Sequence, residues 1–270
     1  MQFAVILRNL LQSISQSQPN QKTYNPKSTI YNMKVLLLAA GLGKRLRPLT
    51  DHKPKALIEV NGTPLIQIAI EYLTHYGFNE IIINVHHHAE QVNHFLNNNQ
   101  NFGHNITVSD ETHRLLDTGG ALKKAAWFFD DDRPFLVYNV DILCDLNLGQ
   151  FYQNHLNSGA LATLAVRHRV SERYLLFDSD NILYGCQNHK TGVTIQPRPS
   201  DLPLKRLAFS GISLLSPGIL RHFPSEDVFT LIDFYLRLAP EFIIKGFQHD
   251  ESRWLDVGKP ENLAKAANFM

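Results

Sequence analysis

The sequence predicts an α/β fold with a mixed, mostly parallel central sheet and helices on both faces. From residue 33 onward, short apolar runs rich in Val and Ile alternate with segments of helical period. Parallel strands need crossover connections, and these place helices on the two faces of the sheet. The 270 residues, 44% of them hydrophobic, are enough for a sizeable core.

The first half of the chain is expected to alternate strands with helices. The strands are expected at residues 35–39, 81–85, 106–109 and 135–139. The helices are expected to start near Leu65, Ala89 and Thr118. Asn61-Gly62 lies between apolar stretches and predicts a tight turn before the first of these helices.

After Asp141 the pattern becomes more antiparallel in character. A hairpin is expected at residues 174–185, turning at 178–181. The other elements are strands at 160–169 and 207–217, a helix at 227–238, short strands at 242–247 and 254–257, and a last helix from Pro260. Asp145 is expected to be the N-cap of the helix that follows it.

Residues 1–32 differ from the rest of the chain. They are polar, rich in Gln, Asn and Ser, and lack a periodicity that would bury one face. We expect an N-terminal extension, disordered or due to an upstream start, before a domain of residues 33–270 with halves 33–145 and 146–270. No apolar run reaches the roughly 18 residues of a membrane-spanning helix, so a membrane partner is not expected.

Charge and cysteine content narrow the function classes. The net charge is +1, from 26 basic and 25 acidic residues, which does not favour nucleic acid as a partner. The two cysteines, Cys144 and Cys186, cannot form a disulfide framework or a metal quartet. This composition suits a reducing compartment, and we expect the protein to be cytoplasmic.

The glycine loop after the first strand excludes two familiar phosphate-binding patterns. A dinucleotide-binding fingerprint with glycines at 41 and 43 needs a third at 46, where the chain has Leu46. A Walker loop ending at Gly43-Lys44 needs glycine where Leu38 stands and a hydroxyl residue where Arg45 stands. A nicotinamide-dependent oxidoreductase is therefore disfavoured.

The loop instead suggests a triphosphate site. Its small residues, Ala39 to Gly43, let backbone N–H groups approach a nucleotide. Arg45 can bind phosphate oxygens with two donors, and Lys55 adds a second cation. Five cationic side chains between residues 44 and 55 would be neutralised by a polyanion; the alternative is a solvated surface loop.

Extended motifs connect this loop to the rest of the chain. LLLAAGLGKRLRPLT (36–50), KPKALIEVNGTPLI (53–66), DTGGALKKA (117–125), YNVDIL (138–143), FSGISLL (209–215) and WLDVGKPENLAKA (254–266) resemble the signature of the sugar-1-phosphate nucleotidylyltransferases, or NDP-sugar pyrophosphorylases. The resemblance implies a single Rossmann-like, three-layer α/β/α domain of the nucleotide-diphospho-sugar transferase type. It also implies transfer of a nucleotidyl group from an NTP to a sugar 1-phosphate, with release of pyrophosphate.

The resemblance assigns roles in nucleotide binding and catalysis. Arg45 would bind the triphosphate and the departing pyrophosphate, and Lys55 the α-phosphate and the sugar phosphate. Leu38, Ala39, Ala40, Gly41 and Gly43 would lie along the nucleoside, and Thr118, Gly119 and Gly120 would border the base. The last three also read as a helix start, and both interpretations can hold together.

Two aspartates are candidate Mg²⁺ ligands. Asp141 ends the apolar strand FLVYNV, at the edge of the sheet where open α/β folds bind ligands. A carboxylate there is costly unless it holds a cation. By resemblance Asp141 and Asp256 bind Mg²⁺, which needs only one or two carboxylates. The alternative is that both are capping or strand-end turn residues.

The sugar side is less well defined. By resemblance Asn139 and Gly211 would face the sugar. Val140 stands where relatives have a small residue, and it could narrow the sugar pocket or pack on the opposite face. Relatives often hold the sugar phosphate with Glu-Lys-Pro; this chain has QPRP at 196–199 and Lys205-Arg206 instead.

The substrate and some other features stay open. The motifs are most similar to those of the uridylyltransferases of cell-wall recycling, which use UTP and N-acetylmuramate 1-phosphate. Guanylyltransferases for mannose or heptose 1-phosphate are close alternatives, and a non-catalytic sugar-nucleotide-binding regulator is another class. A homo-oligomer is possible. The histidines of NVHHHAEQVNH (84–94) read as strand-end residues, residues 130–132 as a solvated turn, and Cys144 as a packing residue.

Overall fold

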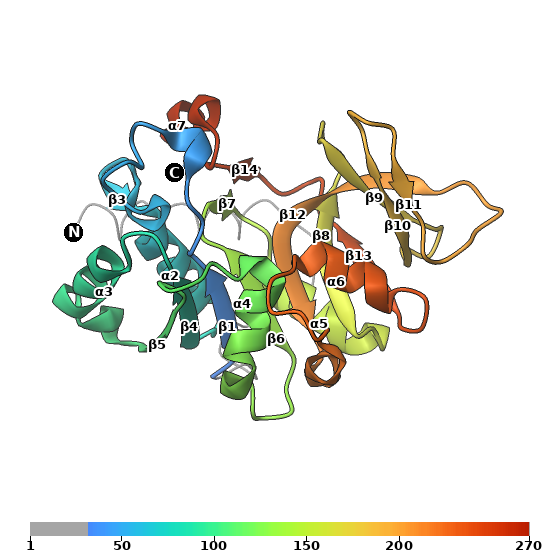
Figure 1. The fold of residues 1–270 in the computed structure, drawn as a ribbon, viewed down its shortest axis with the longest axis horizontal. Helices are drawn as coiled ribbons and strands as arrows, with labels where there is room; N and C mark the ends of the chain where they lie inside the picture. Colours follow the sequence, from blue (N-terminus) through green and yellow to red (C-terminus); the bar gives the residue numbers. More distant parts are fainter. Residues whose placement is uncertain (1–31, 270) are drawn as a thin grey trace, which may run out of the picture.

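The computed structural model describes residues 32–269, which contain one ten-stranded mixed sheet (Figure 1). Its first half is parallel, in the order β6-β1-β4-β5. These strands are β1 (Lys34–Leu38), β4 (Glu80–Val85), β5 (Asn105–Asp110) and β6 (Phe135–Asn139). The four strands expected there are confirmed to within one residue at each end. The expectation for residues 1–32 falls outside the described residues, apart from Asn32.

The second half of the sheet is mainly antiparallel, as expected. Its strands are β8 (Ala162–Arg167), β9 (Arg173–Phe177), β10 (Leu183–Asn188), β11 (Thr194–Ile195), β12 (Lys205–Leu215) and β13 (Ile244–Gln248). The long strand β12 joins the halves, because its start pairs with β9 and its end with β6, both antiparallel. It also pairs antiparallel with β8, which pairs parallel with β13.

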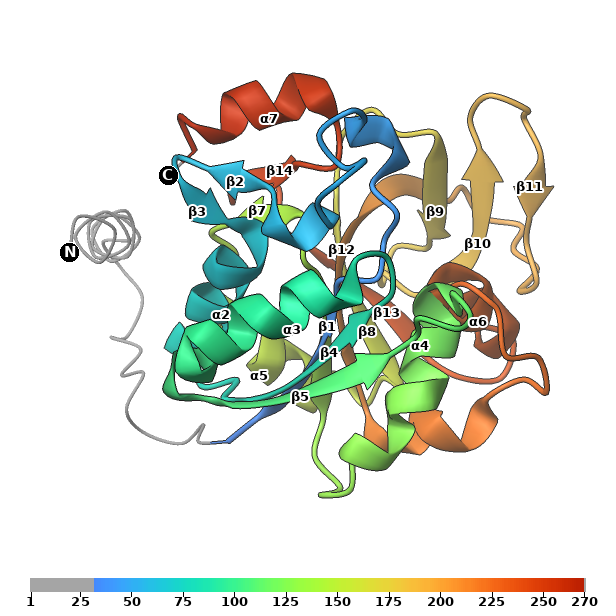
Figure 2. The same cartoon turned by 60° about the vertical axis from the view of Figure 1, so that its left-hand side comes forward.

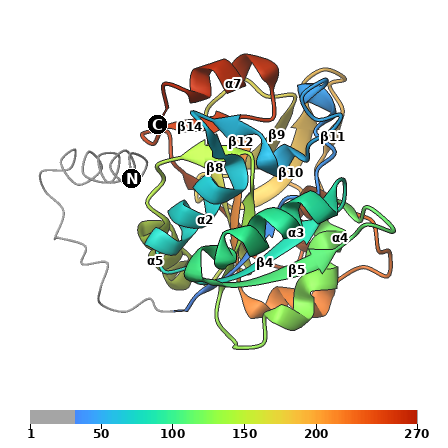
Figure 3. The ribbon, with the colours of Figure 1, turned by 90° about the vertical axis from the view of Figure 1, so that its left-hand side faces the viewer.

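Helices cover both faces of the sheet (Figure 3). One core holds apolar residues of α2 (Leu65–His75), α3 (Ala89–Asn98) and α5 (Leu148–Ser158), and the other those of α4 (Asp117–Ala125) and α6 (Leu231–Leu238). Val35 and Leu37 point into the first core, and Leu36 and Leu38 into the second. The uninterrupted apolar run of β1 therefore reflects burial on both faces.

Turn and cap residues set the element boundaries. Asn61 and Gly62, with φ values of 50° and 77°, form the expected tight turn between β2 (Glu59–Val60) and β3 (Thr63–Pro64). The hairpin turn at 178–181 is also confirmed. Helix α6 starts later than residue 227, because the Thr230 hydroxyl caps it by accepting a 3.0 Å bond from Asp233 N–H. The last helix, α7 (Pro260–Ala266), starts where expected.

Short 3₁₀ turns complete the fold at Lys44–Leu46 (η1), Lys55–Leu57 (η2), Gln100–Gly103 (η3), Ala126–Phe128 (η4) and Pro217–His222 (η5). Within the described residues, no helix is both long and apolar enough to cross a membrane.

A small antiparallel pair, of which only the strand at 254–257 was expected from the sequence, corrects the role of Asp145. Strand β7 (Ile142–Cys144) pairs with β14 (Trp254–Asp256), so the chain just after β7 lies opposite Arg253. Asp145 accepts 2.7 Å bonds from the backbone N–H and Nε of Arg253. The N-cap of α5 is instead Asn147, whose side chain accepts from Gln150 N–H. The expected Asp145 cap is therefore wrong.

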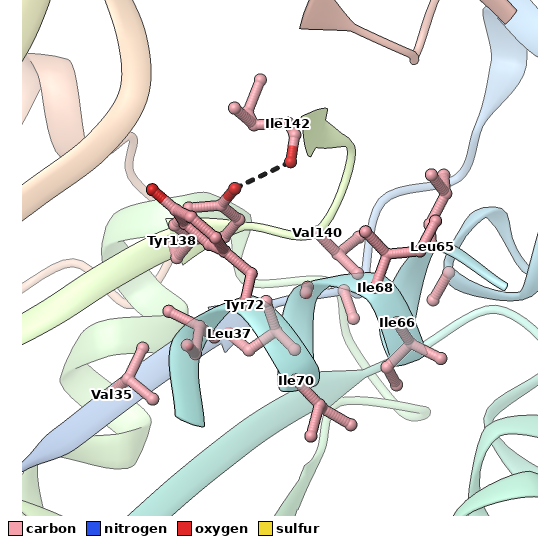
Figure 4. Close-up of a cluster of buried hydrophobic side chains, with 14 of the residues drawn as sticks. Val35, Leu37, Leu65, Ile66, Ile68, Ile70, Tyr72, Tyr138, Val140 and Ile142 are labelled. Carbon is pink, nitrogen blue, oxygen red and sulfur yellow. Dashed lines mark hydrogen bonds between the residues drawn. The ribbon is translucent and has the colours of Figure 1, made fainter. Parts of the chain in front are cut away.

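Val140 packs into the core instead of facing a ligand. It is 3% exposed and points toward Leu65 and Ile68 of α2 (Figure 4). Its N–H also donates to the Leu38 carbonyl at 3.1 Å, which extends the β1–β6 pairing by one residue. Asp141 follows it in the turn between β6 and β7 and is itself 7% exposed.

Candidate active site

The basic loop between β1 and α2 is held in a defined turn. Gly43 has φ 62°, and a Cβ there would lie 2.7 Å from Thr50 Cγ2. The Thr50 hydroxyl donates to the Gly43 carbonyl at 2.9 Å. A Cβ at Gly41 would meet no atom within 4 Å, so this part of the backbone is open. The turn thus fixes η1, which carries Arg45, and leaves the glycine approach unobstructed.

A buried polar relay fixes the start of this loop. Ala39 N–H donates to Asn84 Oδ1 at 2.8 Å, and Asn84 Nδ2 donates to Glu111 Oε1 at 2.8 Å. The other oxygen, Glu111 Oε2, accepts from Leu116 N–H, just before α4, at 3.1 Å. Burial raises the pKa of Glu111, although these donors oppose the shift. Two candidate nucleotide segments, at 38–43 and 118–120, are therefore tied to one carboxylate that sequence reasoning did not single out.

The two candidate metal aspartates are brought together by the β7–β14 pair. Asp141 directly precedes β7, and Asp256 ends β14 in register with Ile142. Val257 N–H donates to the Asp141 carbonyl at 2.9 Å, which continues the pairing. Residues separated by more than a hundred positions in the sequence are thereby placed side by side.

Each aspartate has a cation from the basic loop. Lys55 Nζ is hydrogen-bonded to Asp141 Oδ2, and the side chains are only 14% and 11% exposed. Arg45 Nη2 lies 3.6 Å from Asp256 Oδ2, with side chains 55% and 20% exposed. Burial and the negative charge of Asp141 raise the pKa of Asp256, while the charges of Arg45 and Lys55 act to lower it.

Gly258 is the point where these four residues meet. A Cβ there would lie 2.6 Å from Asp141 Oδ2, 2.7 Å from Lys55 Nζ and 2.9 Å from Arg45 Nη2. Its N–H donates to Asp256 Oδ1 at 2.8 Å. Sequence reasoning did not assign Gly258 a role, although it lies two residues after Asp256.

The carboxylate pair fits a magnesium site. Within the described residues there is no group of three or more His, Cys, Asp and Glu side chains that could hold a metal. Mg²⁺ does not need one, because it takes one or two carboxylates together with phosphate oxygens and water. Asp141 and Asp256 could supply those carboxylates, since their mutual repulsion is relieved by a cation between them.

The glycines at the start of α4 pack against the segment before α6. Gly119 and Gly120 donate to the Phe229 carbonyl at 2.9 and 3.2 Å. A Cβ at Gly120 would lie 2.0 Å from the Asp227 carbonyl oxygen, and the Thr118 hydroxyl accepts from Leu231 N–H at 2.9 Å. Close packing thus accounts for both glycines, and the helix starts at Asp117, one residue before the expected Thr118.

The two candidate sugar residues touch each other where β6 and β12 pair. Gly211 has φ 79°, and a Cβ there would lie 2.9 Å from Asn139 Nδ2 and 3.0 Å from Ile142 Cγ1. The strands are in register at Ile212 and Tyr138. Asn139 and Gly211 are therefore adjacent to β7, which leads the chain away from Asp141.

The structure does not bring the alternative phosphate-binding candidates to the four charged residues. Arg198 of QPRP lies over Tyr184, 5.4 Å from its ring centroid, and donates to the Phe242 carbonyl at 3.3 Å. Lys205 Nζ donates to the Ser179 carbonyl at 3.4 Å. Both side chains therefore contact the β9–β10 hairpin, and Arg198 also contacts the segment just before β13.

Two other sequence features have structural partners. Cys144 is buried, and its Sγ lies 3.7 Å from Tyr138 Oη and 3.5 Å from Tyr72 Oη. Burial raises the pKa of the Cys144 thiol, which suits a packing residue better than a nucleophile. His86 Nδ1 lies 2.7 Å from the Glu111 carbonyl oxygen, at the end of β4 as expected.

The comparisons with known proteins define the family. Residues 34–270 match the family model described as nucleotidyl transferase. The chain belongs to this family, as its motifs indicated. By its family and its fold, the protein is an α/β nucleotidyltransferase.

Similar proteins carry several substrate names. Over 234 residues the chain is 30% identical to N-acetylmuramate alpha-1-phosphate uridylyltransferase of Neisseria meningitidis serogroup B, with 87% of this chain and 96% of that protein covered. Over 241 residues it is 40% identical to mannose-1-phosphate guanyltransferase of Gibberella zeae, with 86% and 62% covered. The chain spans only 60 to 62% of the length of several such relatives.

The solved structures support the fold. HddC from Yersinia pseudotuberculosis, in its complex with GMP-PN, superposes with a TM-score of 0.69 at 24% identity, covering 87% of this chain and 98% of that chain. The likeness shows that the three-layer arrangement and sheet order belong to a known fold.

Proposed function

We propose that this protein transfers a uridylyl group from UTP to N-acetylmuramate 1-phosphate and releases pyrophosphate. One observation carries the proposal: Arg45, Lys55, Asp141 and Asp256 converge around Gly258 from segments far apart in the chain. Two cations beside two carboxylates can bind a triphosphate together with a divalent ion. Membership of the nucleotidyl transferase family supports the same chemistry.

The transfer is a direct displacement at phosphorus. An oxygen of the sugar phosphate forms a bond to the α-phosphorus, and the bond from that phosphorus to the β-bridging oxygen breaks. Pyrophosphate leaves with the electron pair. The sugar phosphate is already anionic at neutral pH, so no side chain needs to remove a proton. Catalysis then depends on positioning and on neutralising charge.

Each residue has a place in this proposal. Arg45, the more exposed cation, can form two parallel hydrogen bonds to the leaving phosphates. Lys55, more buried, sits beside Asp141 where the α-phosphate and the sugar phosphate would meet. Asp141 and Asp256 would hold Mg²⁺, which when bound neutralises negative charge on the phosphates.

The choice of substrate rests on the relatives. The Neisseria uridylyltransferase is matched over 96% of its length, so this chain corresponds to nearly all of it. Guanylyl transfer to mannose 1-phosphate is the second candidate, because the Gibberella guanyltransferase is more similar at 40% identity. That relative, however, has substantial length outside the match.

A substrate matrix tests the proposal. Pyrophosphate release would be measured for four NTPs, each combined with the 1-phosphates of N-acetylmuramate, glucose, mannose and a heptose. We expect the highest kcat/KM for UTP with N-acetylmuramate 1-phosphate. A preference for GTP with mannose or heptose 1-phosphate would replace it with the second candidate. Nucleotide binding without turnover of any pair would instead indicate a non-catalytic regulator.

A further inference from the structure

Arg169 carries a positive charge that no carboxylate of residues 32–269 contacts. It lies just after β8, and its Nη2 and Nη1 donate to the carbonyls of Phe209 at 2.8 Å and Val170 at 3.3 Å. Its Nε is buried and has no hydrogen-bond partner within residues 32–269. Burial lowers the pKa of Arg169, although the charge of Asp256 opposes the shift. A buried, unpaired donor on a charged group is costly unless a ligand satisfies it.

The guanidinium is held on the face of β14 that carries Asp256. It stacks over the Trp254 ring, 4.5 Å from the ring centroid. Trp254 and Asp256 are two residues apart on one strand, so their side chains share a face. The carbonyl that Arg169 binds belongs to Phe209, two residues before Gly211 on β12. Arg169 thus contacts both Trp254 of β14, the strand that ends at Asp256, and β12, the strand expected to face the sugar.

The loop that carries Arg169 also approaches the basic loop of the first half. The pKa of Glu172 is lowered mainly by its hydrogen bond from Lys190, and the charges of Lys259 and Arg45 add to this shift. Glu172, three residues after Arg169, is therefore within electrostatic reach of Arg45. Figure 2 shows η1, β14 and α7 gathered on the same side of the sheet.

Charge balance indicates what Arg169 binds. Arg45, Lys55, Asp141 and Asp256 sum to zero formal charge, and one Mg²⁺ would add two positive charges, which is fewer than the negative charges of a nucleoside triphosphate and a sugar phosphate together. An arginine keeps its charge at any working pH, and its Nε and an Nη can bind two oxygens of one anionic group in parallel. The Trp254 ring limits the movement of the guanidinium, so the cost of ordering it on binding is small.

We infer that Arg169 is a specificity-determining residue that binds an anionic oxygen group of the sugar substrate. The inference rests on the proposed function for the identity of that substrate. N-acetylmuramate 1-phosphate carries two such groups, its phosphate and its lactyl carboxylate, and both offer the same paired oxygens to Nε and Nη. Arg169 contacts β12 and Trp254 of β14, whereas Arg198 and Lys205 are bound to carbonyls elsewhere, at Phe242 and Ser179.

Arg169→Met tests the inference, because it keeps a stem that can cover Trp254 and removes the donors. We expect KM for the sugar 1-phosphate to rise about tenfold or more while KM for the NTP changes less than about twofold. Arg169→Lys restores the positive charge but not the paired N–H donors of the guanidinium, so it should recover part of the lost affinity for the sugar 1-phosphate. An unchanged KM for the sugar, or an equal rise for both substrates, would overturn the inference.

Two sugar substrates distinguish the two anionic groups. N-acetylglucosamine 1-phosphate lacks the lactyl carboxylate but keeps the phosphate. Weaker binding of both sugars by Arg169→Met, measured by calorimetry as well as kinetics, assigns Arg169 to the phosphate. Weaker binding of N-acetylmuramate 1-phosphate alone assigns it to the carboxylate.

The matched control is Arg198→Met, since Arg198 also stacks on an aromatic ring and binds a backbone carbonyl. It should leave both KM values unchanged. Failure of the proposed function would appear separately, in the wild-type protein. If the wild type prefers another substrate pair, the variants are compared on that pair. If it turns over none, calorimetry with the sugar 1-phosphates decides, and equal affinities for wild type and Arg169→Met reject the inference.

Discussion

The two halves of the sheet contribute to the site in different ways. In the parallel half, β1 and β6 are adjacent. Arg45 and Lys55 lie in the short turns η1 and η2 after β1, and Asp141 lies two residues after the end of β6. In the antiparallel half the chain forms five strands and a helix after β8 before β14 returns to pair with β7. In the parallel half each residue is placed by the strand or turn next to it in the sequence, whereas Asp256 is placed by a strand that pairs with a distant part of the chain.

The difference also appears in the burial of the two ion pairs. Lys55 and Asp141, both supplied by the parallel half, are nearly buried, whereas Arg45 and Asp256 join the two halves and are more exposed. Removing one partner of a buried pair leaves a desolvated charge, while an exposed pair is screened by water. Substitutions in the two halves should therefore differ in the size of their effects.

Asp141→Asn should have the largest effect, with kcat/KM for the preferred substrates lower by about 10³-fold or more. It removes the charge that faces Lys55 and the proposed Mg²⁺ while keeping the side-chain shape. Steady-state pyrophosphate release measures the loss. Asp145→Asn is the control, because Asp145 pairs with Arg253, which is not one of the four charged residues around Gly258. Near wild-type activity of Asp141→Asn would exclude Asp141 as an essential ligand.

His155 should give the antiparallel half a pH-dependent stability. Burial lowers the pKa of His155 from 6.5 to about 4. Since the Ser216 hydroxyl donates to the Ala160 carbonyl, it accepts from His155 Nε2–H, and Nδ1 accepts from the Thr163 hydroxyl. The neutral ring is therefore the form that fits.

Between pH 6.5 and 4 only the unfolded chain binds a proton at this histidine, so stability falls as the pH falls through that window. We expect His155 to account for about 3 kcal/mol of the loss in unfolding free energy. Denaturant unfolding at several pH values should show a smaller pH dependence for His155→Gln than for wild type. Identical slopes would show that His155 is not held neutral.

Gly258→Ala should displace the charged side chains that the two halves bring together around Gly258. Its Cβ would approach Asp141, Lys55 and Arg45 to within 2.9 Å, so at least one of them must move. We expect kcat to fall by about 10²-fold, because small misplacements of reacting groups are costly. Gly218→Ala is the control, since its Cβ would make an ordinary 3.5 Å contact. Equal kinetics for the two variants would contradict the role given to Gly258.

Glu111→Gln should weaken the hydrogen bonds that hold the two candidate nucleotide segments, 38–43 and 118–120, and leave the sugar side unaffected. A glutamine can accept from Asn84 or from Leu116 N–H with its one carbonyl oxygen, but its amide cannot replace the second acceptor. We expect a stability loss of about 1–3 kcal/mol and a raised KM for the NTP, with KM for the sugar nearly unchanged. Thermal unfolding and kinetics measure both. A selective effect on the sugar would contradict this division.

Removing residues 1–32 should have the smallest effect. Met33 is 3% exposed, and its N–H donates to the Gly77 carbonyl at 3.1 Å, so a chain that starts there keeps the anchor of β1. The family match also begins at residue 34. We expect unchanged kcat/KM and unfolding temperature. A clear loss of activity in the shortened protein would assign a function to the segment.

The sequence predicted the parallel half well, because its signals are local. The buried strands β1, β4 and β6 are mostly apolar, and the Asn61-Gly62 turn has residues typical of a tight turn. The pairing of β7 with β14 could not be predicted from the sequence. A short strand was expected at 254–257, but the three residues of β7 carry no detectable period, and nothing local indicates which strands pair. The Asp145 assignment was wrong for the same reason, since its partner Arg253 is 108 positions away.

The candidate site shows the same limit. Arg45, Lys55, Asp141 and Asp256 were found through motifs, and the structure adds that they are neighbours, although their roles stay predictions. Gly258 and Arg169 were not found, because a glycine's lack of a side chain and an arginine's missing partner are visible only once the surrounding atoms are known.

The β7–β14 pair has a consequence for the order of synthesis. A nascent chain that ends before residue 254 already contains all the strands of the ten-stranded sheet, together with Lys55 and Asp141. It still lacks Asp256 and Gly258, so it has only one of the two carboxylates. The proposed site can therefore be completed only once the last segment of the chain has been made and β14 has paired with β7.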